Sequence, residues 1–405
     1  LWYITVKLLY QEWVYLRILC LQCSKCYHGV IMKIVLTAGL YPDEIGGPAT
    51  FASLLESELP LRGVEVVDVP FGWVRHYPRG IRHVVFAWKL WRASKGAQSI
   101  CALDAVSVGL PAVLVARLRK IPLLVRLSGD YAWEQGRMRF GIKETLDEYS
   151  KNPLNAPWRV RLLARVQTYV VRQATEVIVS SKYLRGIVVK WGIDETKIKV
   201  VYSALYPIEV NSARDTLRSQ LQYSYPTLVS AARLVPWKGF RVLIEVLGEL
   251  KKSYPDISLV IIGDGEERKK LESQVAKSGL GEHVRFTGRI TKEALGASVK
   301  AADVFVLNTA YEGLSHQLIE VMDLGVPIVT TKSGGNPELI TNGVNGYLVD
   351  FNDAAQLVEA ITRILNHPES RDRLTQSARL RSKDFQKSLV VGEIEKIIKH
   401  LSPKK

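Results

Sequence analysis

Two glutamates with seven residues between them stand in the segment Glu312-Gly313-Leu314-Ser315-His316-Gln317-Leu318-Ile319-Glu320. We expect Gly313 to Ser315 to begin a helix, whose unpaired N–H groups and positive dipole end suit a phosphate. Glu312 would then stand at the mouth of a cleft, with Glu320 about two turns into the helix. Carboxylates accept paired hydrogen bonds, so both residues suit the hydroxyls of a sugar or ribose. The same spacing alone is also typical of a solvated helical face.

Two cations stand earlier, in Ala231-Ala232-Arg233-Leu234-Val235-Pro236-Trp237-Lys238-Gly239. Arg233 and Lys238 follow a predicted strand and precede a predicted helix. Two cations on one such loop can neutralise a diphosphate. Each of them, taken alone, is compatible with an ordinary surface charge.

The elements that must position these residues follow from the apolar pattern. Short apolar segments alternate with helical ones from Met32 onward and again after Pro207, which predicts two parallel sheets with covering helices. We expect strands at residues 33–37, 64–69, 99–102, 122–127, 176–180 and 199–202, then at 226–230, 258–262, 284–287, 304–307, 328–331 and 346–349. We expect helices at residues 49–59, 84–93, 108–118, 158–173, 239–252, 266–278, 292–301, 315–324 and 354–365, and a mostly helical end over 371–400. Ligands of such sheets bind beyond the carboxyl ends of the strands.

The expected domain division is 32–207, 208–375 and a helical tail over 376–405. Residues 1–31 begin with Leu1, and we interpret them as an upstream extension that is not native. They contain Cys20, Cys23 and Cys26, with His28 nearby, a pattern that also suits zinc or an iron–sulfur cluster.

Composition excludes several classes of protein. The chain has 405 residues, 47% of them hydrophobic, which excludes global disorder, and its four cysteines exclude a disulfide scaffold. The net charge is +15, of which residues 32–205 carry +10, while residues 206–375 carry −2. This asymmetry favours an anionic partner, either nucleic acid or a membrane face, although solubility alone would also explain it.

The first half has two loops of interest. Gly46-Gly47-Pro48 follows the first predicted strand, and its glycines permit close backbone approach to a ligand, although a plain turn is the alternative. Ser128-Gly129-Asp130 follows another strand, and we take Asp130 as the candidate for contacting a sugar or acceptor hydroxyl, with Glu134 second. An aspartate that only caps a helix is the alternative for Asp130.

A dinucleotide fingerprint is a rival interpretation of Gly263-Asp264-Gly265, which lies between a predicted strand and helix. The third glycine of that fingerprint is missing, because Arg268 occupies its position. We therefore do not expect NAD binding.

The second half resembles the donor-binding domain of retaining glycosyltransferase family 4, the glycosyl transferases group 1, which has the GT-B fold. The resemblance covers roughly residues 226–350. The matching elements, in family order, are Arg233 and Lys238, Gly263-Asp264-Gly265, Phe286-Thr287-Gly288, Glu312 through Glu320, Gly325-Val326-Pro327, Gly334-Gly335-Asn336-Pro337-Glu338 and Asn342-Gly343-Val344-Asn345-Gly346. It implies an α/β protein with two Rossmann-like domains facing a central cleft, and a C-terminal helix that packs back on the N-terminal domain.

The resemblance also implies a role for each matching residue. Arg233 and Lys238 would bind the donor diphosphate, Glu312 would contact the donor sugar, and Glu320 would hold the ribose. The other implied contacts are backbone N–H groups of Gly313, Leu314 and Ser315, the loop of Gly46 and Gly47 against donor phosphate or acceptor, and Gly288, Arg289 and Ile290 near the nucleobase. The chain departs from the family at Ser128-Gly129-Asp130, where a histidine is common, and at Ser203-Ala204, where Asn-Gly is common.

The implied function is a retaining hexosyltransferase that moves sugar from a UDP- or GDP-sugar to a hydroxyl acceptor, with no required cofactor or metal ion. Such a reaction proceeds by attack on the face that the leaving phosphate occupies. The alternatives are a sugar-nucleotide epimerase or a phosphorylase of the same fold, an inactive nucleotide-sugar binder, and a nucleic-acid-binding protein.

The acceptor is suggested by residues 71–95, which hold six Lys or Arg, no acid, and Trp73, Trp88 and Trp91. Basic residues among aromatics suit an anionic membrane interface or single-stranded nucleic acid, and the tryptophans could instead belong to the core. Because the second half carries the donor-domain motifs, we expect a peripheral membrane contact and an acceptor that is lipid-linked or a cell-surface glycan precursor. We expect no nucleic-acid partner and a cytoplasmic location.

Overall fold

The computed structural model describes residues 32–39, 47–78 and 80–401, and its strands form two sheets. The first sheet holds β1 (Met32–Thr37), β2 (Val64–Asp68), β3 (Ser99–Ala102), β4 (Leu123–Leu127), β5 (Glu176–Val179) and β6 (Ile198–Val200). The second holds β7 (Thr227–Ala231), β8 (Ser258–Ile262), β9 (Val284–Gly288), β10 (Val304–Leu307), β11 (Ile328–Thr331) and β12 (Tyr347–Val349). Residues 1–31, with the interpretation as an upstream extension and the alternative of a metal site at Cys20, Cys23, Cys26 and His28, lie outside the described residues.

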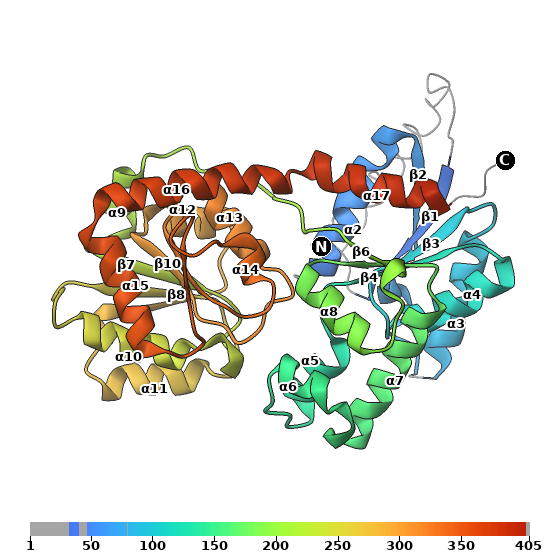
Figure 1. The fold of residues 1–405 in the computed structure, drawn as a ribbon, viewed down its shortest axis with the longest axis horizontal. Helices are drawn as coiled ribbons and strands as arrows, with labels where there is room; N and C mark the ends of the chain where they lie inside the picture. The colour runs from blue at the N-terminus through green and yellow to red at the C-terminus, as the bar shows by residue number, and fades with distance from the viewer. Residues whose placement is uncertain (1–31, 40–46, 79, 402–405) are drawn as a thin grey trace, which may run out of the picture.

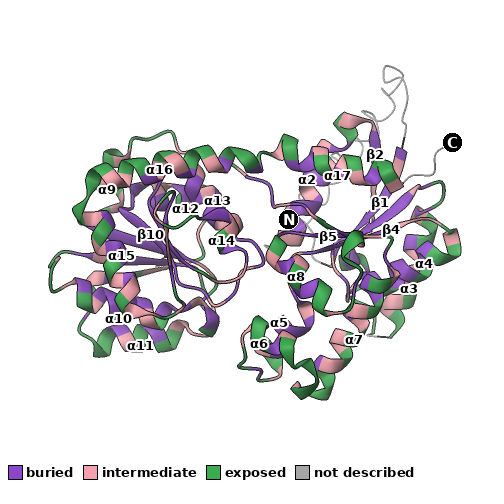
Figure 2. Cartoon of the chain, in the orientation of Figure 1, coloured by how far each residue is buried: buried purple, intermediate pink, exposed green. Residues whose placement is uncertain are grey.

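Both sheets are parallel throughout, with strand orders β2-β1-β3-β4-β5-β6 and β12-β11-β10-β7-β8-β9. Most strands are apolar runs, such as Val-Phe-Val-Leu in β10, because helices cover both faces of a parallel sheet. Figure 2 shows the strands as the buried interior of each half. The expected doubly wound α/β fold is confirmed, and every expected strand exists within two residues of its predicted bounds.

The helices connect successive strands and cover the sheets. They are α2 (Gly47–Glu58), α3 (Ile81–Ala93), α4 (Gly109–Arg119), α5 (Tyr131–Arg139), α6 (Leu146–Lys151), α7 (Trp158–Gln173), α8 (Lys182–Lys190), α9 (Arg214–Leu221), α10 (Phe240–Leu250), α11 (Arg268–Lys277), α12 (Lys292–Ala301), α13 (His316–Leu324), α14 (Asn336–Leu339), α15 (Ala354–Asn366), α16 (Pro368–Ser382) and α17 (Lys387–Leu401). The sequence did not predict α5, α6, α8, α9 or α14.

The C-terminal helices join the two halves. In Figure 1, α16 lies over the second half and α17 continues over the first half, beside α2. Val390, Val391, Ile394 and Ile398 of α17 are buried in one apolar cluster with residues of β1 and α2. At the other edge of α17, Arg62 forms a 3.1 Å ion pair with Glu395. The expected return of the C-terminal helix to the N-terminal half is therefore confirmed.

Candidate functional site

Lys238 and Glu312 form an ion pair in the space between the two halves. Lys238 ends a short 3-10 turn after β7, and Glu312 follows β10, the neighbouring strand in the sheet. Parallel strands end at one edge, so residues 74 positions apart in sequence meet there. Their side chains retain 13% and 20% exposure, which leaves the pair accessible to a ligand.

Arg233 belongs to the same loop as Lys238 and is exposed toward the cleft. Its guanidinium carbon lies 5.7 Å from the centre of the Trp237 ring, and the residue lines a cleft cavity of about 700 Å³. The same cavity is lined by Ser128, Gly129 and Glu134, which follow β4. Arg233 is thus brought beside residues of the other half.

The start of α13 is built for close approach. Ser315 caps the helix by accepting a hydrogen bond of 3.3 Å from the Leu318 N–H, and Leu314 is buried. A side-chain carbon at Gly313 would overlap the backbone carbonyl of Ser128, so only glycine lets this loop contact the first half. The helix start therefore faces the cleft, and its positive end is available for an anion.

Glu320 forms a 2.9 Å ion pair with Lys292, the first residue of α12. Burial raises the pKa of Glu320, and the ammonium of Lys292 opposes that shift. Lys292 also donates a 3.1 Å hydrogen bond to the carbonyl of Tyr206 in the segment between the sheets. Sequence reasoning missed Lys292, because no short-range motif connects it to a glutamate on a different helix.

The predicted nucleobase segment follows β9, the edge strand of the second sheet. Gly288 has a φ of 71°, and its carbonyl accepts a 2.9 Å hydrogen bond from the Gly263 N–H, which joins the ends of two neighbouring strands. Arg289 is exposed, and Ile290 packs partly buried against the core of this half. All three residues stand at the carboxyl edge that also presents Lys238.

In the first half, α2 begins at Gly47, whereas Gly46 lies outside the described residues. A side-chain carbon at Gly47 would lie 3.4 Å from Nε2 of His316 on α13. The starts of two helices therefore face each other across the cleft. Burial, Arg126 and Lys292 together lower the pKa of His316 to about 4, which keeps its imidazole neutral at physiological pH.

Asp130 is a helix cap rather than an open cleft residue. Its Oδ1 accepts hydrogen bonds from the Trp133 N–H at 3.0 Å and from Gln167 at 3.2 Å, and the residue is 1% exposed. These contacts correspond to the alternative of the sequence analysis, in which the aspartate caps α5. Of the two candidates, Glu134 is the one that lines the cleft cavity.

Glu134, one turn along α5, lines the cleft cavity. A side-chain carbon at Gly129 would overlap both the Glu134 carboxylate and the Tyr311 hydroxyl, so glycine lets α5 approach the second half. Burial and the neighbouring Asp130 carboxylate raise the pKa of Glu134 to about 7, although Arg233 and Lys238 pull it down. Glu134 can therefore exchange a proton near neutral pH.

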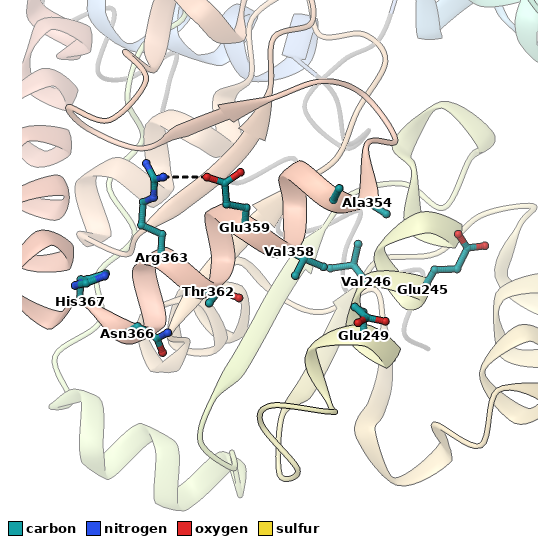
Figure 3. A pocket seen from close by; sticks show the side chains of 11 residues that line it. Glu245, Val246, Glu249, Ala354, Val358, Glu359, Thr362, Arg363, Asn366 and His367 are labelled. Atoms are coloured by element: carbon teal, nitrogen blue, oxygen red, sulfur yellow. Dashed lines mark hydrogen bonds and ion pairs between the residues drawn. The ribbon is translucent and has the colours of Figure 1, made fainter.

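A second large cavity, of about 710 Å³, contains none of the predicted site residues. It lies between α10 and α15 on the outside of the second half, as Figure 3 shows. Its edges carry Glu245, Glu249 and Glu359, and the last pairs with Arg363 at 2.9 Å. The chemistry-bearing residues gather in the cleft instead.

The basic segment places its tryptophans at the surface. Trp73, Trp88 and Trp91 are 52%, 52% and 43% exposed, so the core interpretation of these residues is wrong. A cation stands over each ring: Lys89 over Trp73, Arg92 over Trp88 and Arg119 over Trp91, at 5.3, 5.0 and 4.3 Å from the ring centres. Leu110, Leu114 and Leu118 of the neighbouring α4 are also exposed.

Within residues 32–39, 47–78 and 80–401, three or more His, Cys, Asp or Glu side chains nowhere gather as they would around a metal ion. None of the helices in these ranges combines the length and hydrophobicity that crossing a membrane requires.

Two protein families match successive parts of the chain. Residues 28–204 match "Glycosyl transferase 4-like domain", and residues 214–381 match "Glycosyl transferases group 1".

Curated relatives and solved structures are similar as well. A Mycolicibacterium smegmatis protein named GDP-mannose-dependent alpha-(1-6)-phosphatidylinositol monomannoside mannosyltransferase is 37% identical over 35% of this chain and 39% of its own. The phosphatidyl-myo-inositol mannosyltransferase of Mycobacterium leprae is 25% identical over 79% of this chain and 92% of its own. Several other matches span less than half of the relative's length. The crystal structure of Anabaena HepE in complex with UDP superposes with a TM-score of 0.72 at 19% identity, over 91% of this chain and 100% of HepE.

Proposed function

This chain belongs to the glycosyl transferases group 1, with the GT-B fold, and from that premise we propose that it transfers a hexose from a UDP- or GDP-sugar to a hydroxyl acceptor with retention of anomeric configuration. The observation that carries the proposal is the Lys238–Glu312 pair, with Arg233 on the same loop, facing the first half across the cleft. A cation beside a carboxylate suits a ligand whose diphosphate is joined directly to a sugar.

The donor would lie across the second sheet. Arg233, Lys238 and the N–H groups at the start of α13 would bind the diphosphate, and Glu320 would accept hydrogen bonds from the ribose hydroxyls, in place of part of its contact with Lys292. Glu312 would contact the sugar, and residues 288–290 would lie near the base. The segments that follow β7, β8 and β9 lie next to one another along the carboxyl edge of the sheet. Their order supports this arrangement of the diphosphate, ribose and base of the donor.

In the reaction, the acceptor oxygen bonds to the anomeric carbon while the bond from that carbon to the diphosphate oxygen breaks. The hydroxyl proton passes to the leaving phosphate on the same face. Negative charge grows on the diphosphate, and fixed cations and N–H groups stabilise it without reorganising. Glu134 would orient the acceptor hydroxyl, because it lines the cleft beside Arg233. No step requires Glu312 and Glu320 as an acid and base pair.

The acceptor would be presented at a membrane surface. The exposed tryptophans of residues 71–95, each under a cation, and the net charge of +10 over residues 32–205 support a contact with anionic lipid. Two relatives are named as mannosyltransferases of phosphatidylinositol or its monomannoside, and these names support a lipid-linked acceptor. We propose accordingly that the protein works at the cytoplasmic face of a membrane.

Thermal denaturation of the full chain with UDP, GDP, ADP, CMP and their sugars, with and without magnesium, tests the donor assignment. A ligand that binds only the folded protein raises its midpoint. We expect one nucleotide to do so, Lys238→Met to lose the effect and Glu320→Ala to weaken it. No shift at millimolar concentration would contradict the proposal. An epimerase would convert the bound donor without any acceptor, which NMR of the sugar nucleotide distinguishes from transfer.

A further inference from the structure

Arg126 of β4 is a charged residue in the interior of the first half. It is 1% exposed, and among the residues that the structure describes it is the only lysine or arginine so deeply buried. Its neighbours in the strand, Val125 and Leu127, are apolar core residues on the face of the sheet that α3 and α4 cover. Side chains alternate along a strand, so Arg126 points to the other face, beneath α2.

Within the described part of the chain, the guanidinium of Arg126 has no hydrogen-bond acceptor, since Nε, Nη1 and Nη2 all lack a partner there. The face of the group stacks on the ring of Phe51 in α2, with 3.6 Å between Cζ and the ring centre. Stacking engages the flat face of a guanidinium, whereas its five N–H donors point outward in the plane. The contact with Phe51 therefore leaves the donors unsatisfied.

The other two charged residues that are fully buried in the described ranges, Asp130 and Asp303, have hydrogen-bond partners, which makes Arg126 an exception. Asp303, also 1% exposed, accepts hydrogen bonds from Arg218 at 2.8 Å and from the Thr227 N–H at 2.7 Å. Burial lowers the pKa of Arg126 only to about 10, so the side chain remains positively charged at neutral pH. A buried charge without a partner is costly, and such a group in a native protein requires an explanation.

The surroundings of Arg126 favour an anion. The first turn of α2 stands against His316 in the first turn of α13, so the positive ends of two helices converge there. Arg126 and Lys292 act on the same imidazole of His316, which places both cations near this junction. Arg126 also lines the cleft cavity, together with Gly39 and Pro48. A ligand in the cleft can therefore reach it.

We propose that Arg126 is a substrate-binding residue, whose guanidinium donates hydrogen bonds to an anionic oxygen of a ligand bound between α2 and α13. The anion is a phosphate of the donor diphosphate or an anionic group of the acceptor. This inference rests on the proposed function for the identity of its ligand. The buried charge is tolerated because the ligand supplies the acceptors that the protein lacks.

Isothermal titration with UDP and GDP, and thermal denaturation with inorganic phosphate, test the role of Arg126 in the full chain. The variants are Arg126→Met, which keeps the length without the charge, and Arg126→Lys, which keeps the charge without the planar donors. Arg241→Met, at an exposed arginine of α10 on the outer face, is the matched control. Phosphate is added to protein alone and to protein saturated with the nucleotide.

If the anion belongs to the donor, Arg126→Met weakens nucleoside diphosphate binding by at least about tenfold, because charge-assisted hydrogen bonds are lost. Arg126→Lys then retains part of the affinity. If the anion belongs to the acceptor, nucleotide affinity is unchanged, but the stabilisation of saturated protein by phosphate disappears in Arg126→Met. In both cases Arg126→Met without ligand is as stable as wild type or more stable, since an unpaired buried charge is removed.

If Arg126→Met binds nucleotide and responds to phosphate as wild type does, the inference is overturned. If its thermal midpoint without ligand is also lower than that of wild type, Arg126 has a purely structural role. Failure of the proposed function gives a different result. Wild-type protein would then bind no nucleotide at all, while its response to phosphate, compared with that of Arg126→Met, would still decide whether Arg126 binds anions.

Discussion

The carboxylate of Glu338 on α14, in the second half, accepts a 2.8 Å hydrogen bond from the backbone N–H of Tyr183 at the start of α8, in the first half. Its other oxygen accepts from the Lys182 N–H at 2.9 Å and from the Tyr202 hydroxyl at 3.1 Å. Ser181 already caps α8 through the Leu184 N–H. A glutamate of one half therefore completes the helix start of the other and holds the cleft walls together.

We expect Glu338→Ala to lower the thermal midpoint and to cost about 1 kcal/mol of stability, the usual effect of losing a cap. Differential scanning calorimetry measures it. Glu359→Ala, at an exposed glutamate of α15 that pairs only with Arg363, is the control. A midpoint equal to that of wild type would show that the contact across the cleft contributes nothing.

Lys238→Met should slow sugar transfer by about two to three orders of magnitude, the usual loss when a fixed group that stabilises developing charge is removed. Turnover of the donor identified by thermal shift is the measurement. Lys252→Met removes an exposed lysine paired with Glu249 and serves as the control. Transfer within a few-fold of wild type would exclude Lys238 from stabilising the leaving group.

Glu320→Ala should abolish the preference for a ribonucleotide over its 2′-deoxy analogue, because the carboxylate that accepts from the ribose hydroxyls is gone. Titration calorimetry with the two nucleoside diphosphates gives the ratio of their affinities. Glu272→Ala, on α11 and paired with Arg268, should leave the ratio unchanged. If Glu320→Ala discriminates as well as wild type, Glu320 does not bind the ribose.

Glu134 makes stability depend on pH. Its folded pKa is about 7, against an ordinary value of 4.5, so the folded state binds the proton more tightly. The contribution of this group to the free energy of unfolding is therefore full below pH 4.5 and is lost as the pH rises to about 7. The side chain of Glu134→Gln stays neutral. We therefore expect the thermal midpoint of this variant to rise relative to that of wild type as the pH increases from 5 to 8. Glu245→Gln on the outer face is the control, and an equal difference at both pH values would refute the assignment.

Trp88→Ser with Trp91→Ser should reduce co-sedimentation with anionic liposomes at low salt, because the two rings are exposed on α3 beside basic residues. Tyr225→Ala, an exposed aromatic of the second half with Arg218 near its ring, is the matched control. If the double variant binds liposomes as well as wild type does, or if wild type does not bind them, the proposed membrane contact is wrong.

The local pattern of the sequence determined the strands, most long helices and the order of the donor motifs. The apolar run Val-Phe-Val-Leu of β10 is fully buried, so its composition alone predicts a strand. Helices α5 and α6 escaped prediction because they are short, and they depend on caps at Asp130 and Thr145. Arg233, Lys238 and Glu312 were candidates because they follow predicted strands, and Glu320 because it stands about two turns into the helix that follows Glu312.

Only the tertiary structure decided which of these side chains meet. The ion pair Lys238–Glu312 joins residues that approach because parallel strands end at one edge, whereas Lys292–Glu320 joins the helices α12 and α13, which contact each other. Asp130 is further engaged by Gln167, which is 37 residues away in sequence and donates a hydrogen bond to its Oδ1. Arg126 lies in an apolar strand, where its residue type suggests an exposed edge, and only packing shows that its charge is buried without a partner. Distances between segments far apart in sequence follow from packing of the whole fold, and no local pattern contains them.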